Sequence, residues 1–181
     1  DIPVPTGRPG TYDKSRNEKR KWLSQLQEME QITPMLSIDT DTKGAPSFIV
    51  ETCIANSRDI ELVTIGPLTN IAQALDIEPS LSEHVNKITM MAGAATVQGN
   101  VTPAAEFNIW ADPESASKVF KSGIPIRMVP LDVCHKTRFG REHLNQSGKN
   151  NHPFCQFVQD SVDPWLKINP NQDIIDQGLH L

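Results

Sequence analysis

The sequence is poor in several residue types, and each shortage excludes a class of protein. It holds only three cysteines in 181 residues, and aromatic residues make up 6%. Cys53, Cys134 and Cys155 are too few and odd in number for a disulfide scaffold, and none has zinc-finger spacing. We therefore expect buried or free thiols in a reducing compartment and a cytoplasmic location, with secretion left open.

The chain also lacks an excess of basic residues and a long apolar run. Lys and Arg number 17 against 22 Asp and Glu, for a net charge of -5, whereas a domain that binds polyanions normally carries excess positive charge. A membrane span needs roughly 18 consecutive apolar residues. The best run here covers only residues 88–95. We expect neither nucleic acid nor a membrane as a partner.

We expect a single α/β domain over residues 1–181, built from three stretches. Residues 1–45 form an irregular and helical lead-in, with an amphipathic helix over 13–31. From 46 to 135, helices and strands alternate, which is typical of an open, mostly parallel sheet with helices on both faces. Residues 136–181 are predicted to be a helical C-terminal segment.

The alternating region predicts particular elements. Short runs rich in β-branched residues indicate strands at 60–65, 87–91 and 124–133. One helix is expected to open at Pro67 and another after Asp112, because Asp is a good N-cap and proline is favoured at the first helical position. The loops after the carboxyl ends of parallel strands are where ligands bind.

One such loop is unusually long. About twenty residues separate Met91 from Asp112, where two to six are usual. The loop carries Asn100 and Glu106, with Asn108 close behind, and these side chains together offer donors and acceptors for several hydroxyls of a small polyol. Residues of this type are also common in turns, so a plain turn-and-cap role is the alternative interpretation.

Four motifs occur in an order known from one family. They are VTIGPLTNIA at 63–72, GNVTPAAEFN at 99–108, DPESA at 112–116 and PLDV at 130–133. Together they resemble the inosine-uridine preferring nucleoside hydrolases, and the likeness covers residues 46–135. The resemblance implies hydrolysis of the N-glycosidic bond of purine or pyrimidine ribonucleosides to free base and ribose, with a bound calcium ion, Ca2+, in an open α/β fold.

Carried over position by position, the resemblance implies three ribose-binding residues, two pocket-wall residues and one calcium ligand: Asn100, Glu106 and Asn108, then Phe107 and Met91, then the main-chain carbonyl of Ile65. A carbonyl ligand makes no demand on the side chain at its position. Cleavage of a ribosyl bond builds oxocarbenium-like charge on the sugar, so an enzyme gains by clamping the ring through its hydroxyls. The attacking water also needs a carboxylate as general base.

Two landmarks of that family do not occur in this sequence. One is an Asp-rich opening of the type DTDPGxDDA, and the other is a His-Asp-Pro motif. Asp39 and Asp41 stand too close to Pro67 in the chain to be the first, and we interpret them as an exposed acidic turn. The sequence therefore resembles the middle of such an enzyme. We expect the general base and most calcium ligands on segments absent here, so the catalytic residue is unknown.

Three hypotheses remain at this point. The first is a ribonucleoside hydrolase whose partner is a small-molecule ribonucleoside, and the resemblance also implies a homo-oligomer. The second is a catalytically inactive nucleoside- or ribose-binding homologue or fragment that lacks the metal site. The third is a generic doubly wound domain without a site, which would require the joint match of the motifs to be accidental.

Overall fold

The structure is a computed structural model, and it describes residues 2–7, 10–12, 44–139, 153, 155–157, 160 and 179–180. The chain forms two compact units. The first comprises Asp1–Lys19 and Ile38–Asp132, and the second comprises Arg20–Ser37 and Val133–Leu181. The helix expected over 13–31 lies outside the described residues, as does most of the segment 136–181. The domain boundaries stay a prediction.

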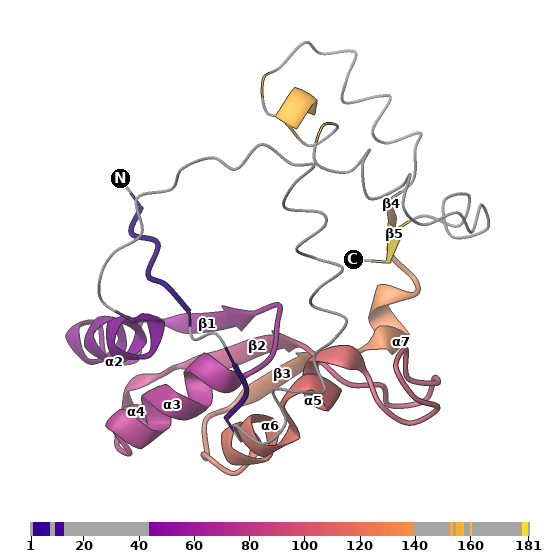
Figure 1. The fold of residues 1–181 in the computed structure, drawn as a ribbon. Helices are drawn as coiled ribbons and strands as arrows, with labels where there is room; N and C mark the ends of the chain where they lie inside the picture. Colours follow the sequence, from indigo (N-terminus) through magenta and orange to yellow (C-terminus); the bar gives the residue numbers. More distant parts are fainter. Residues whose placement is uncertain are drawn as a thin grey trace. The chain divides into compact units, whose positions relative to one another are not determined.

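The first unit contains a three-stranded sheet in which all strands run parallel (Figure 1). Its strands are β1 (Glu61–Thr64), β2 (Lys87–Met91) and β3 (Ile126–Val129), in that order across the sheet. Because the strands are parallel, their carboxyl ends meet at one edge. The prediction of an open, parallel α/β sheet is confirmed.

Helices precede, separate and follow the strands of the sheet. They are α2 (Ala45–Ala55), α3 (Thr69–Ile77), α4 (Leu81–His84), α5 (Phe107–Ala111), α6 (Pro113–Phe120) and α7 (Leu131–Cys134). The helix expected from Pro67 begins two residues later, at Thr69. The helix after Asp112 is confirmed, with the Asp112 carboxylate accepting a hydrogen bond from the Ser115 N–H at 3.2 Å. None of the helices in the described part of the chain combines the length and apolar character that a membrane crossing requires.

The strand expected over 124–133 is shorter than predicted, since β3 ends at Val129. Pro130 has no N–H and does not continue the ladder of the sheet. Helix α7 begins at the next residue. Because the strand ends early, Asp132 lies in the first turn of a helix at the carboxyl edge of the sheet.

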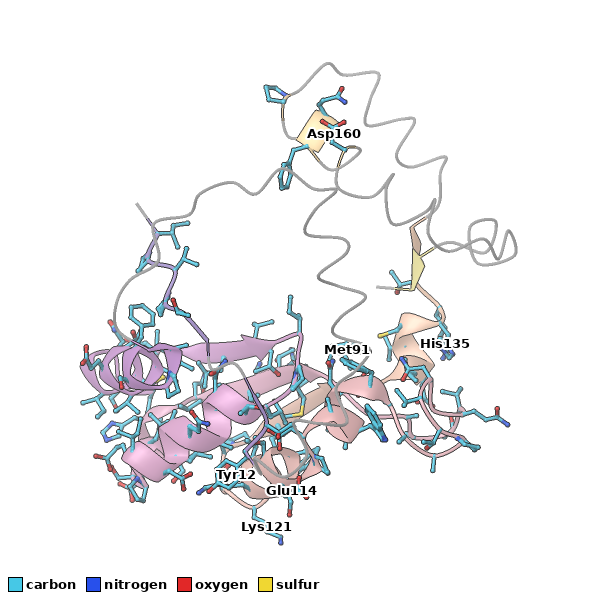
Figure 2. All side chains as sticks on the ribbon, viewed as in Figure 1. Tyr12, Met91, Glu114, Lys121, His135 and Asp160 are labelled. Carbon is cyan, nitrogen blue, oxygen red and sulfur yellow. The ribbon has the colours of Figure 1, made fainter. Side chains whose placement is uncertain are left out.

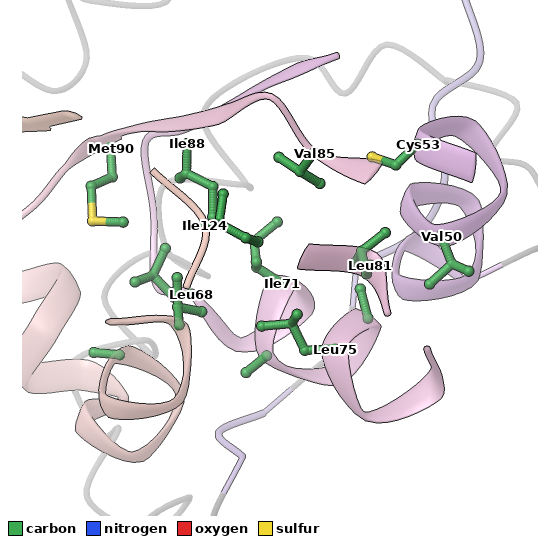
Figure 3. Packing of buried hydrophobic residues seen from close by; sticks show 14 of the residues in the cluster. Val50, Cys53, Leu68, Ile71, Leu75, Leu81, Val85, Ile88, Met90 and Ile124 are labelled. Carbon is green, nitrogen blue, oxygen red and sulfur yellow. The ribbon is translucent and has the colours of Figure 1, made fainter. Parts of the chain in front are cut away.

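Apolar side chains of the helices pack against one face of the sheet (Figure 3). The fully buried members include Leu68, Leu81, Ile88, Met90 and Val119. Burial of each such side chain stabilises the fold by about 1.5 to 3 kcal/mol. Alternate residues of the strands point to the opposite face, where Val63 is 69% exposed and Ile65, just beyond the end of β1, is 84% exposed.

The second unit contains a short antiparallel pair of strands, β4 (Arg138–Phe139) and β5 (Leu179–His180). Cys53 and Cys134 are buried, and Cys155 is half-buried. Burial raises the pKa of the Cys53 thiol, because the charged thiolate is poorly solvated in the interior. Cys53 therefore serves as a small core residue.

Candidate functional site at the carboxyl edge of the sheet

The residues singled out from the sequence follow the ends of two neighbouring strands. Ile65 comes directly after β1, and Met91 is the last residue of β2. The other four lie in the long loop after β2 or in the short helix α5 that ends it. Parallel pairing of β1 with β2 puts these strand ends at the same edge, and Figure 2 marks Met91 there.

Glu106 is a buried carboxylate at the start of α5. It is 2% exposed. Its Oε1 accepts from the Asn108 N–H at 2.8 Å, and its Oε2 accepts from the N–H groups of Ile109 at 3.3 Å and Gly93 at 2.9 Å. The carboxylate thus satisfies two free donors of the helix start and also ties α5 to the end of β2. Among the described residues, Oε1 accepts this one hydrogen bond and so keeps one acceptor position.

Asn108 connects α5 to the last residue of β2. Its side-chain Nδ2 donates to the main-chain carbonyl of Met91 at 3.0 Å and lies 3.2 Å from the Met91 sulfur. Because the nitrogen must face that carbonyl, the orientation of the amide is determined. The residue is 6% exposed, and within the described residues its Oδ1 accepts no hydrogen bond. Oδ1 is therefore an acceptor available to a ligand.

Asn100 presents the complementary group. Its Oδ1 accepts from the N–H of the half-buried Phe107 at 2.9 Å. This bond leaves Nδ2, which donates to no other group in the described part of the chain. The side chain is exposed, so the amide N–H groups are free to donate to a ligand.

The loop that carries Asn100 folds tightly on itself. The Gly99 N–H donates to the Pro103 carbonyl at 3.2 Å, and the Val101 N–H donates to the Ala105 carbonyl at 3.1 Å. A Cβ atom on Gly99 would lie 2.3 Å from the Ala105 carbonyl oxygen. Only glycine allows this close approach of two backbone segments.

The turn-and-cap role and the ligand-binding role predicted from the sequence involve different atoms of these side chains. Capping is real, because Asn100 Oδ1 and both oxygens of Glu106 hold backbone N–H groups at the start of α5. The remaining groups are a donor on Asn100 and acceptors on Asn108 and Glu106. A hydroxyl both donates and accepts, so this set suits a ligand with several hydroxyls.

Sequence reasoning gave no role to Asp132, which the structure brings to the same edge from the end of β3. Its carboxylate accepts from the N–H groups of Ala95 and Thr96, each at 2.8 Å, and from the Thr96 hydroxyl. The Thr96 hydroxyl and then the Ala95 N–H hold the pKa of this carboxyl well below its usual range. In the sequence, the place of Asp132 two residues after Pro130, which ends the predicted strand early, could have indicated that Asp132 lies at this edge.

The described residues do not by themselves form a calcium site. Among them, no three His, Cys, Asp or Glu side chains are placed to hold a metal ion. The main-chain carbonyl of Ile65 stands at the strand edge where a ligand is expected, but calcium takes six to eight oxygens. Asp39 and Asp41 lie outside the described residues.

An open parallel sheet with polar side chains at its carboxyl edge, the edge where ligands bind in such sheets, defines an α/β protein. Comparison with known proteins identifies the family within this class. The family model of the inosine-uridine preferring nucleoside hydrolases matches residues 2–179, and the chain belongs to this family.

Individual relatives agree with this assignment. The pyrimidine-specific ribonucleoside hydrolase RihA of Shewanella woodyi is 48% identical over 107 residues, which is 59% of this chain and 34% of that protein. The putative pyrimidine-specific ribonucleoside hydrolase RihB of Shigella boydii is 43% identical over 132 residues, covering 73% of this chain and 54% of the relative. The chain thus spans between a third and about half of the length of these relatives.

A solved structure supports the fold. The purine-preferring ribonucleoside hydrolase from Gardnerella vaginalis superimposes with a TM-score of 0.70 and 34% identity. The superposition covers 74% of this chain and 42% of that one.

Proposed function

We propose that the protein containing this chain hydrolyses the N-glycosidic bond of ribonucleosides, releasing free base and ribose. The observation that carries the proposal is the set of hydrogen-bonding groups at the carboxyl edge of the sheet that the described residues leave unused, in a member of this family. Asn100 offers a donor, and Asn108 and Glu106 offer acceptors. Such a set holds a ribose by its hydroxyls while charge develops on the ring during bond cleavage.

Each residue has a defined task in this proposal. A ribose hydroxyl donates to Asn108 Oδ1, a second donates to the remaining position of Glu106 Oε1, and Asn100 Nδ2 donates to a hydroxyl oxygen. Met91 and Phe107 line the space beside them, and Met91 also orients Asn108 through its carbonyl. The general base is assigned to no residue described in the structure.

We also propose that the main-chain carbonyl of Ile65 is one ligand of a calcium ion, as the family resemblance implies. The described residues supply too few oxygens to hold the ion by themselves. Dialysis against a chelator followed by return of calcium or magnesium tests the ion. We expect activity to disappear with the chelator and to return with calcium, whereas full activity in the metal-free protein contradicts this part.

The full-length protein should release ribose from inosine or uridine, measured as reducing sugar. Replacement Asn108→Ala removes the acceptor and the bond to Met91, so we expect kcat/KM to fall about 10- to 100-fold. Asn56→Ala is a matched control, since the Asn56 side chain also donates to a backbone carbonyl, that of Thr52 at 2.9 Å, on the exposed end of α2.

Three results distinguish the hypotheses. Turnover that falls in Asn108→Ala and is unchanged in Asn56→Ala supports the enzyme. Binding of ribose or nucleoside by calorimetry without any turnover indicates a binding protein instead. A wild-type protein that neither binds nor cleaves a ribonucleoside overturns the proposal. A panel of purine and pyrimidine nucleosides in the same assay defines the base preference.

A further inference from the structure

The turn that leads from β2 into the site loop is anchored to the end of β3. Asp132 accepts from the Ala95 N–H and the Thr96 N–H, both at 2.8 Å, and from the Thr96 hydroxyl. Next to it, the Leu131 N–H donates to the Gly93 carbonyl at 2.9 Å. One carboxylate and one backbone group thus hold residues 93–96 against the start of α7, the helix that follows β3.

The same turn is attached to the ligand-facing residues on its other side. The Gly93 N–H donates to Glu106 Oε2 at 2.9 Å, and Glu106 Oε1 holds the Asn108 N–H at 2.8 Å. Gly93 has a φ of 73°, and a Cβ atom there would lie 3.3 Å from the Met128 methyl. A non-glycine residue would be strained in this left-handed conformation, so the turn has little freedom to shift.

We propose that Asp132 is a positioning residue for ribonucleoside binding, acting through Thr96 and the turn 93–96 to set the places of Glu106 and Asn108. This inference rests on the proposed function. Hydrogen bonds to an ionised acceptor are roughly twice as strong as those between neutral groups. A binding site loses affinity when the groups supporting it are loose, even if every contacting residue is present.

The expected effect is on substrate affinity. Asn100, Glu106 and Asn108 would hold the hydroxyls in the ground state as well as in the transition state, so misplacing them raises KM more than it lowers kcat. Asp132→Asn keeps the size of the side chain but turns an NH2 group toward backbone donors. Thr96→Val keeps the shape and removes only the hydroxyl.

The chain offers a matched control at the other end of the sheet. Glu61 also accepts from a threonine hydroxyl, that of Thr89 at 2.5 Å, and it pairs with Lys87 at 3.0 Å. Glu61 is the first residue of β1 and pairs with Lys87, the first residue of β2, whereas Thr89 lies in the middle of β2. Glu61→Gln therefore removes the same kind of carboxylate without touching the turn 93–96.

The test is steady-state hydrolysis of inosine and uridine by the full-length wild type and these variants, with thermal unfolding in parallel. We expect KM to rise about tenfold in Asp132→Asn and about threefold in Thr96→Val, with kcat within about twofold of wild type. The double variant should be no worse than Asp132→Asn alone, because both changes break one unit. Glu61→Gln should keep the wild-type KM.

Two results overturn the inference while leaving the proposed function intact. One is a wild-type KM in both Asp132→Asn and Thr96→Val. The other is a joint collapse of kcat and thermal midpoint in Asp132→Asn while Thr96→Val keeps its KM, because that pattern is a general loss of structure. A wild-type protein without hydrolysis overturns the proposed function itself, and this role of Asp132 with it.

Discussion

The two ends of the β1–β3 sheet, which Figure 1 shows as a ribbon, differ in what their carboxylates bind. Toward the amino ends, Glu61 binds the Thr89 hydroxyl and Lys87 on the exposed face of the sheet. Toward the carboxyl ends, Glu106 is 2% exposed and accepts three backbone N–H groups. A carboxylate that binds side chains on a surface leaves the backbone unaffected, whereas one that binds backbone groups determines the path of a loop.

The physical difference lies in solvation and in the partners. An exposed ion pair is screened by water and contributes little to stability. A buried carboxylate has lost its water, so each of its hydrogen bonds is needed, and removing the charge leaves donors without partners. We therefore expect substitutions at the carboxyl edge to have large effects and those at the amino end to have small ones.

The largest effect is expected for Gly99→Ala. The new Cβ would overlap the backbone of Ala105 at 2.3 Å, so the loop must open. We expect the free energy of unfolding to fall by about 3 kcal/mol and nucleoside binding to be lost. Gly66→Ala is the control, because a Cβ there meets nothing within 4 Å. Chemical denaturation measures the free energy of unfolding of both variants. Equal stability of the two would show that the loop does not require glycine at position 99.

A smaller but clear difference is expected between Glu106→Gln and Glu61→Gln. Glutamine at 106 would turn an NH2 group toward the backbone donors of Gly93 and Asn108, or leave one of them unpaired, at a cost of about 1 to 3 kcal/mol. At position 61 we expect a thermal midpoint within about 2 °C of wild type. Urea unfolding measures the loss of stability at position 106, and thermal unfolding measures the midpoint at position 61. A Glu61→Gln variant as unstable as Glu106→Gln would break the comparison.

The smallest effect is a pH dependence at Asp132. Its folded-state pKa is lowered, chiefly by the Thr96 hydroxyl and then by the Ala95 N–H. A lowered pKa means that the stabilisation is complete above the unfolded value of about 3.9 and is lost as the pH falls toward the folded value. The gap in thermal midpoint between wild type and Asp132→Asn should therefore be constant from about pH 7 to 5 and shrink toward pH 2. A gap that widens in acid contradicts the assignment.

Local sequence signals predicted several elements well. The strand over 87–91 and the helix after Asp112 were predicted from β-branched runs and from capping chemistry, which are properties of neighbouring residues. The end of β3 was misjudged, although Pro130 carried the information, because apolar residues continue past it to Val133. The region over 13–31 lies outside the described residues, so its predicted helix stays a prediction.

The candidate site was predictable in part. The long loop after Met91 and its polar residues were visible as a spacing, and the motifs indicated the family. The spacing did not reveal that side-chain oxygens of Asn100 and Glu106 cap α5. It also did not reveal that Asp132 binds Ala95 and Thr96, which precede it by more than thirty residues. Contacts of that separation arise only when the strands are paired.

The sequence by itself determined the three parallel strands and the helices α3 and α6 between them, the length of the loop and the residue types at the edge, because periodicity, caps and motifs are read along the chain. Tertiary structure alone decided which atoms stay free for a ligand. Parallel pairing brings the ends of β1, β2 and β3 together. Hydrogen bonds across that edge then use some carboxylate and amide atoms to hold the loop and leave other atoms of the same groups for a ligand.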